Sequence, residues 1–138
     1  MIRWRMHFSS APADVYLALT TREGRESFWA EQAPESDGII HFEFINGVRT
    51  SSEIIEAEPA SRFAIRYFGA LAMFDLERPR DGGTDLTLTT TEFDRVDRED
   101  LRAGWLNVLF PMKAAVDHDV DLRNHDRHRT WADGFADQ

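Results

Sequence analysis

The last residues of the chain hold the densest group of side chains that could do chemistry. Three histidines and four aspartates occur within a short stretch, and they are His118, His125, His128, Asp117, Asp119, Asp121 and Asp126. Imidazole and carboxylate groups bind zinc, but their spacing here follows no tight zinc pattern. The sequence contains no cysteine, which excludes disulfides, thiolate catalysis and cysteine zinc sites. We therefore expect no metal site and no cofactor.

The same segment contains three arginines, a feature that also occurs in nucleic-acid-binding tails. Arg123, Arg127 and Arg129 are interrupted by Asp126, however, and the whole chain has a net charge of −9 from 25 acidic and 16 basic residues. An acidic protein is repelled by phosphate groups. The charge therefore predicts neither a nucleic acid nor a membrane surface as a partner.

Two stretches bear on the compartment of the protein. The N-terminal stretch MIRWRMHFSS lacks the apolar core of a secretory signal peptide. The longest nearly apolar run, residues 67–74, is too short to cross a bilayer. The sequence therefore favours a soluble, cytoplasmic protein.

No stretch has the spacing of a known reaction motif. The P-loop, the dinucleotide-binding glycine pattern, the nucleophile elbow and the zinc-protease helix are all absent. The nearest carboxylate set, Glu53, Glu56 and Glu58, has the irregular spacing of a solvated strand edge. We therefore predict no catalytic residue.

The N-terminal part of the chain predicts one strand and two short helices. Residues 2–8 alternate loosely, as a strand does. A helix follows, with Ser10 as its expected cap and Pro12 in its first turn. Thr21 is the expected cap of a second short helix, which leads to Phe28 and Trp29.

Five strand-like stretches lie between residues 38 and 93. The pair Asn46-Gly47 predicts a type I′ hairpin turn between the first two. Short turns join the others, which indicates an antiparallel meander rather than a parallel βαβ array. Alternation assigns one set of apolar side chains to the inner face: Ile40, Phe42, Phe44, Phe63, Ile65, Tyr67, Met73, Leu86 and Leu88.

From Asp97 the apolar spacing changes to that of a long helix, predicted to end near Leu122. Pro111 lies inside this helix and predicts a kink, because it removes one backbone hydrogen bond. The apolar face of the helix comprises Leu101, Trp105, Val108, Leu109, Met112 and Val116.

Together these elements predict an α+β domain in residues 1–122. A curved antiparallel sheet of six to seven strands would surround one long C-terminal helix, with two short helices after the first strand. A curved sheet around a helix favours a pocket between the two. Residues 123–138 continue beyond this domain. Because tryptophan and phenylalanine are rare in disordered tails, Trp131 and Phe135 predict a C-terminal extension that folds back on the domain.

Four stretches, in the same order as in one known family, carry a resemblance: APADVYLALTTREGRESFWA, ING, GGTDLTLTTTEF and GWLNVLFPMKAAVD. They resemble the activator-of-Hsp90-ATPase-homologue (AHSA1-like) branch of the START/Bet v 1-like (SRPBCC) superfamily. The resemblance implies a helix-grip fold with a cavity between sheet and long helix. Superfamily members bind lipids, sterols, polyketides or other apolar molecules, and some are cyclases or hydroxylase components. The eponymous activator stimulates a chaperone ATPase.

Three hypotheses about function follow. We favour a protein that binds an apolar small molecule in this cavity, without a reaction of its own. The alternatives are an enzyme of cyclase or hydrolase type that uses the same cavity, and a chaperone-interaction module similar to the Hsp90 activator. A homodimer is compatible with each. The residues expected to contact the ligand are Trp29, Phe42, Phe44, Phe63, Ile65, Tyr67, Met73, Leu88, Trp105, Leu109 and Met112.

Overall fold

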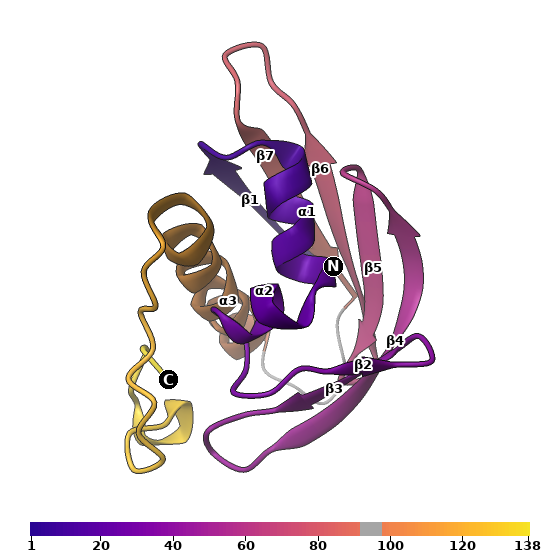
Figure 1. Cartoon of the computed structure of the whole chain (residues 1–138). Helices are drawn as coiled ribbons and strands as arrows, with labels where there is room; N and C mark the ends of the chain where they lie inside the picture. Colours follow the sequence, from indigo (N-terminus) through magenta and orange to yellow (C-terminus); the bar gives the residue numbers. More distant parts are fainter. Residues whose placement is uncertain (92–97) are drawn as a thin grey trace.

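The computed structural model describes residues 1–91 and 98–138 and has a helix-grip α+β fold (Figure 1). In this part of the chain, seven strands form one antiparallel sheet in the order β1-β7-β6-β5-β4-β3-β2. The helices are α1 Pro12–Thr20, α2 Arg22–Glu26 and α3 Arg98–His118. The strands are β1 Ile2–Phe8, β2 Glu35–Ser36, β3 Ile39–Glu43, β4 Arg49–Glu58, β5 Arg62–Tyr67, β6 Ala70–Glu77 and β7 Thr84–Thr90. The fold class predicted from the sequence is confirmed.

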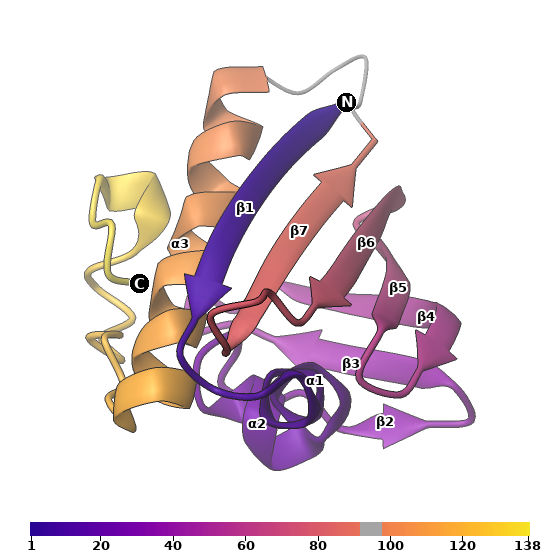
Figure 2. The ribbon, with the colours of Figure 1, turned by 90° about the horizontal axis from the view of Figure 1, so that it is seen from above.

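Helix α3 lies along the sheet beside β1 and buries the face predicted from its periodicity (Figure 2). Trp105, Leu109 and Met112 are all buried, and the helix continues through Pro111 to His118. Its predicted start, Asp97, lies outside the described residues. It ends four residues earlier than Leu122, because Asp119 adopts a left-handed φ of 53° that stops the helix.

The buried side chains of the sheet form the core on its inner face. Phe74 in β6 pairs with Phe63 in β5 and with Leu88 in β7, and all three are buried. The side chain of Met73 points to the opposite face, where Ala64 is its cross-strand partner. The prediction that Met73 belongs to the inner face is therefore wrong, because successive strand residues face opposite ways and Phe74 faces inward.

Two hairpin turns differ from the sequence-based expectation. Between β3 and β4, the N–H of Gly47 donates to the oxygen of Phe44, and Gly47 has a positive φ while Asn46 does not. This is a three-residue loop rather than the predicted type I′ turn. Positive φ values occur instead at Phe68 (49°) and Gly69 (82°), which form the two-residue turn between β5 and β6. A phenylalanine at this position is unusual, and it brings an aromatic ring to the surface.

Ser10 connects the start of the fold to the end of α3 rather than capping α1. Its N–H and hydroxyl both donate to Asp117, whose carboxylate also accepts from the N–H of Ser9 and from Lys113. Burial raises the pKa of Asp117, but these hydrogen bonds outweigh it and lower that pKa to about 2. The predicted cap of α2 is present, since the hydroxyl of Thr21 accepts from Gly24.

The C-terminal extension, residues 123–138, lies along α3 on the side away from the sheet (Figures 1 and 2). The side chain of Arg123 is only 5% exposed, and it donates to the carbonyls of Glu26, the last residue of α2, and of Ala30 in the following loop. It also pairs with Asp121. The bond to Glu26 uses a carbonyl of the last turn of α2, where carbonyl groups lack helical partners.

The rest of the extension is held by a histidine and by its own hydrogen bonds. The two ring nitrogens of His125 lie 2.6 Å from Glu31 and 2.7 Å from Asp121. Asn124 bonds to Asp137, which closes the segment on itself. Trp131 is half-buried, whereas Phe135 is 39% exposed. The segment is therefore an ordered loop structure anchored at Arg123 and His125.

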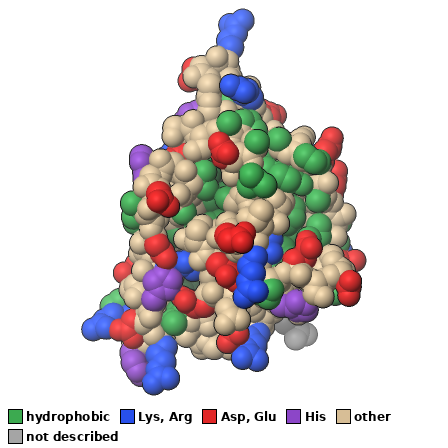
Figure 3. Space-filling view, viewed as in Figure 1, with side chains coloured by type: hydrophobic (Ala, Val, Ile, Leu, Met, Phe, Trp, Pro, Cys, Tyr) green, Lys and Arg blue, Asp and Glu red, His purple; other side chains and the backbone are tan. Residues whose placement is uncertain are grey.

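One face of the molecule carries an apolar surface region. On the face shown in Figure 3, hydrophobic side chains gather over α1 and the neighbouring part of the sheet, and acidic side chains are spread around them. Within residues 1–91 and 98–138, no three histidine or acidic side chains are arranged to hold a metal ion. No helix in the same ranges is long and apolar enough to cross a membrane.

Candidate functional site

The aromatic side chains on the inner face of the sheet meet around Trp29. The centroid of its ring lies 4.9 Å from that of Phe42, 5.4 Å from Tyr67, 5.8 Å from Phe74 and 6.3 Å from Trp105. These rings come from the loop after α2, from three strands and from α3. Such distances are typical of rings in direct contact. We call these five residues the aromatic cluster.

Trp29 is positioned by a buried cation. Arg25 in α2 is 1% exposed, and its guanidinium donates to the carbonyl of Ala33 through two nitrogens and to that of Leu19 through a third. Burial lowers the pKa of Arg25, and the carboxylates of Glu35 and Glu26 partly offset that effect. The bonds of Arg25 fix both ends of the short segment that carries Trp29 into the core.

The aromatic cluster contains one internal hydrogen bond. The indole Nε1 of Trp29 donates to the hydroxyl oxygen of Tyr67 across 3.2 Å. Burial raises the pKa of Tyr67, and the bond from Trp29 lowers it only in part, so the phenol stays protonated at neutral pH. Among the described residues no acceptor meets the proton of this hydroxyl. Tyr67 is half-buried, and its hydroxyl therefore keeps an O–H donor that no described residue uses, beside the apolar rings of the aromatic cluster.

Ser52 in β4 supplies a second unused hydroxyl. Its side chain is fully buried, and its oxygen has no hydrogen-bond partner within the described ranges. Ser52 is the cross-strand partner of Ile40, which faces inward. Ile54 pairs with Ile65, so Ser52, two residues before Ile54, lies toward the same end of β4 and β5 as Tyr67. Near this end of the inner face, the hydroxyl of Ser52 has no hydrogen-bond partner among the described residues, and that of Tyr67 has Trp29 as its donor.

A row of rings continues from the aromatic cluster to the surface. Phe44 stacks on Phe42 with ring centroids 5.9 Å apart, and Phe68 meets Tyr67 at 4.7 Å and Phe44 at 6.2 Å. Phe44 is half-buried, and Phe68 is 46% exposed. We call Phe44 and Phe68 the rim.

The structure brings part of the predicted ligand-binding set together and separates the rest. Trp29, Phe42, Phe44, Tyr67 and Trp105 are in the aromatic cluster or at its rim. Five others are buried in the adjoining core, namely Phe63, Ile65, Leu88, Leu109 and Met112. Met73 is on the other side of the sheet and is excluded. Whether the remaining ten bind a ligand stays a prediction.

Two rings of the site were missed at the level of sequence. Phe74 contacts both Trp29 and Trp105, and its alternation with Ala72 and Leu76 could have assigned it to the inner face. Phe68 depends on a two-residue turn at a position where asparagine or glycine is usual, so no common sequence signal marks it.

Comparison with solved structures relates this arrangement to known proteins. An AHSA1-like protein from Aeromonas hydrophila matches with a TM-score of 0.73 at 15% identity, over 85% of this chain and 95% of that one. The chain has the fold of the AHSA1-like proteins. The Aha1 dimer from Colwellia psychrerythraea matches with a TM-score of 0.74 at 20% identity, over 85% of this chain and 96% of that one. The protein SSP2350 from Staphylococcus saprophyticus matches with a TM-score of 0.76 at 22% identity, over 88% and 95%.

Comparison at the level of sequence gives no match. No protein-family model matches this chain, and no curated protein matches it either. At identities of 15–22% the structural likeness shows the AHSA1-like fold and leaves the ligand to be argued from the site.

Proposed function

We propose that this AHSA1-like protein binds a neutral, apolar ring compound that carries a hydrogen-bond acceptor, between the sheet and α3. The observation that carries this proposal is the hydroxyl of Tyr67. It accepts from Trp29 and has no acceptor of its own within residues 1–91 and 98–138. A carbonyl or ether oxygen of a ligand is the partner that this donor lacks.

The energetics of buried polar groups support such a ligand. The buried hydroxyl of Ser52, without a partner among the described residues, costs about 1–3 kcal/mol, and a ligand that supplies the partner recovers part of that cost. Ser52 can give or accept a second hydrogen bond, because its oxygen has no partner among the described residues. The rings of the aromatic cluster carry no charge, so a charged ligand would be left unpaired in an apolar site.

The packing of the rings indicates how a ligand enters. Because the rings of Trp29, Phe42 and Trp105 are at contact distance, a ligand must replace ring–ring contacts rather than occupy a separate space. The exposed ring of Phe68 and the half-buried ring of Phe44 offer the first stacking surface. The unusual backbone of Phe68 holds that ring at the entrance.

The raised pKa of Tyr67 agrees with a binding role. A phenol whose pKa is raised by burial keeps its proton, so it donates a hydrogen bond and does not act as a base at neutral pH. The fold supports the proposal as well, since the superfamily that the sequence resembles includes carriers of apolar molecules.

Nuclear magnetic resonance can test the proposal on the labelled protein. Two-ring ketones and ethers would be added while the indole N–H resonances of the four tryptophans are followed. We expect the resonances of Trp29 and Trp105 to shift and the melting temperature to rise, because a ligand of the native state stabilises it. If no ketone or ether moves the Trp29 resonance, the proposal is wrong.

A further inference from the structure

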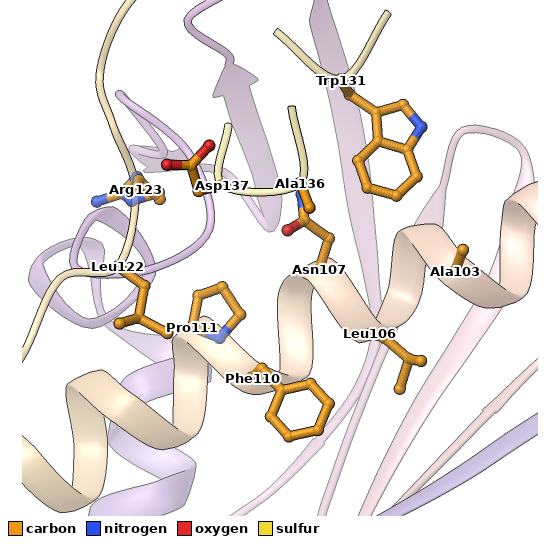
Figure 4. A pocket seen from close by; sticks show the side chains of 10 residues that line it. All are labelled: Ala103, Leu106, Asn107, Phe110, Pro111, Leu122, Arg123, Trp131, Ala136 and Asp137. Atoms are coloured by element: carbon orange, nitrogen blue, oxygen red, sulfur yellow. The ribbon is translucent and has the colours of Figure 1, made fainter. Parts of the chain in front are cut away.

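An apolar hollow lies on the other side of α3, outside the site proposed above. It is about 420 Å³ in volume and runs between α3 and the C-terminal extension (Figure 4). Pockets that hold small molecules have volumes of about 300–1,000 Å³. We call this hollow the outer groove. Its lining residues are Ala103, Leu106, Asn107, Phe110, Pro111, Leu122, Arg123, Trp131, Ala136 and Asp137.

Apolar side chains make up most of the outer groove. Figure 4 shows Leu106, Phe110 and Pro111 of α3 on one side and Trp131 of the extension on the other. Phe110 is 55% exposed, although it lies on the helix that forms the core. The groove therefore offers both an aromatic wall and an apolar floor to a ring-shaped molecule.

Pro111 leaves a backbone acceptor in the outer groove without its donor. In a regular helix the carbonyl of Asn107 would accept from the N–H of residue 111, but proline has no N–H. Ala103, Asn107 and Pro111 are four residues apart and line the same hollow. Figure 4 also shows the side chain of Asn107 directed toward the extension, and among the described residues it has no hydrogen-bond partner.

The charged residues of the outer groove favour a ligand that donates rather than an anion. The guanidinium of Arg123 is already bonded to Glu26, Ala30 and Asp121, so it is not free for a ligand. Asp137 uses one carboxylate oxygen to accept from Asn124. Asp137 thus keeps one carboxylate oxygen as a free acceptor among the described residues, while the amide of Asn107 and the indole N–H of Trp131 can donate.

We propose that the outer groove is a second binding site, which takes a flat apolar ring compound bearing an N–H or O–H donor. The ring would lie between Phe110 and Trp131, and its donor would meet the carbonyl of Asn107. The two sites differ in the group that they require of a ligand. The carbonyl of Asn107 requires a donor, whereas the hydroxyl of Tyr67 requires an acceptor.

The test uses a matched pair of fluorescent probes on the full chain. N-Phenyl-1-naphthylamine has one N–H donor, and its N-methyl derivative has none. We expect the N–H probe to bind about three- to tenfold more tightly, the range of a single hydrogen bond. Pro111→Ala restores the missing backbone N–H to Asn107, so it should abolish this preference. Ala103→Tyr fills the groove and should weaken both probes at least about tenfold.

The matched control is Ala13→Tyr, a change of an exposed alanine on α1 that should leave both affinities unaltered. Equal binding of the two probes to the native chain, or binding that survives Ala103→Tyr, would overturn the proposal. Sedimentation velocity adds one more decisive outcome. If the native chain is a dimer that Ala103→Tyr dissociates, the outer groove is a subunit interface and the proposal is wrong.

Discussion

Trp29 and Tyr67, 38 residues apart in the chain, share a hydrogen bond of 3.2 Å inside the aromatic cluster. This bond gives the indole its partner and leaves the phenol proton without one among the described residues. The same pair of side chains thus links the α2 loop to the sheet and provides the donor on which the proposed function depends.

Removal of the Tyr67 hydroxyl should destabilise the fold. Tyr67→Phe leaves the buried N–H of Trp29 without an acceptor, so we expect a loss of about 1–3 kcal/mol in the free energy of unfolding, measured with urea. Tyr16→Phe is the matched control, because no hydrogen bond joins the hydroxyl of Tyr16 to the rest of the described chain. Equal stability of both variants would mean that the Trp29–Tyr67 bond contributes nothing.

Removal of the Ser52 hydroxyl should stabilise the fold. Ser52→Ala deletes a buried oxygen that has no partner among the described residues, so we expect the chain to gain about 1 kcal/mol in unfolding free energy. Ser51→Ala, on the exposed face of the same strand, removes a hydroxyl bonded to His41 and should not stabilise. A loss of stability in Ser52→Ala would show that this hydroxyl has a partner in solution.

Arg123 should be the main anchor of the C-terminal extension. Arg123→Ala leaves the carbonyls of Glu26 and Ala30 unpaired and should cost about 2–3 kcal/mol, the range for hydrogen bonds to a charged group. Protease cleavage within residues 124–138 should become faster. Arg127→Ala changes an exposed arginine in the same segment and should alter neither quantity. Cleavage at the native rate in Arg123→Ala would contradict this role.

The contact of His125 should depend on pH. The hydrogen bond to Asp121 and the contact with Glu31 raise the pKa of His125 above its usual value of 6.5. Because this pKa is raised, the contribution of His125 to the free energy of unfolding is complete below about pH 6.5. It is lost as the pH rises through the pKa of His125 in the folded protein. Burial raises the pKa of Asp121, but the bonds from Arg123 and His125 lower it to about 2. Its contribution is therefore lost as the pH falls from about 4 toward 2.

Urea unfolding of the native chain and of His125→Gln would measure this dependence. We expect the native chain to be more stable than the variant at about pH 5 and the difference to shrink as the pH rises above the usual histidine pKa of about 6.5. The difference should be about 1 kcal/mol or less, because these side chains are 31–40% exposed. If the stability difference instead grows as the pH rises, the prediction that protonated His125 stabilises the fold is wrong.

Much of the fold could be predicted because local signals agree with the tertiary structure. The alternation of Ile40, Phe42 and Phe44 and the helical spacing of Trp105, Leu109 and Met112 each identify the buried face. Met73 was misassigned because both faces of β6 carry apolar residues, so alternation alone does not choose between them. The end of α3 was missed because Asp119 adopts a left-handed conformation that no glycine marks.

The site was only partly predictable because its polar groups depend on contacts between distant residues. The sequence predicted the rings of Trp29, Phe42, Tyr67 and Trp105. It did not show that Ser52 has no partner in the described part of the chain, or that Arg123 bonds to two carbonyls some ninety residues away. Such bonds depend on how the helices and strands pack against one another. Residue types alone carry no information about that packing.

The central claim is that Tyr67 offers a hydrogen-bond donor to an apolar ligand, and one binding measurement tests it directly. The affinities of 2-acetylnaphthalene and 2-ethylnaphthalene, which differ in a carbonyl acceptor, would be measured for the native chain and for Tyr67→Phe. We predict that the native chain prefers the ketone about three- to tenfold and that Tyr67→Phe binds both compounds equally. A native chain that binds neither compound, or a ketone preference that persists in Tyr67→Phe, would contradict the claim.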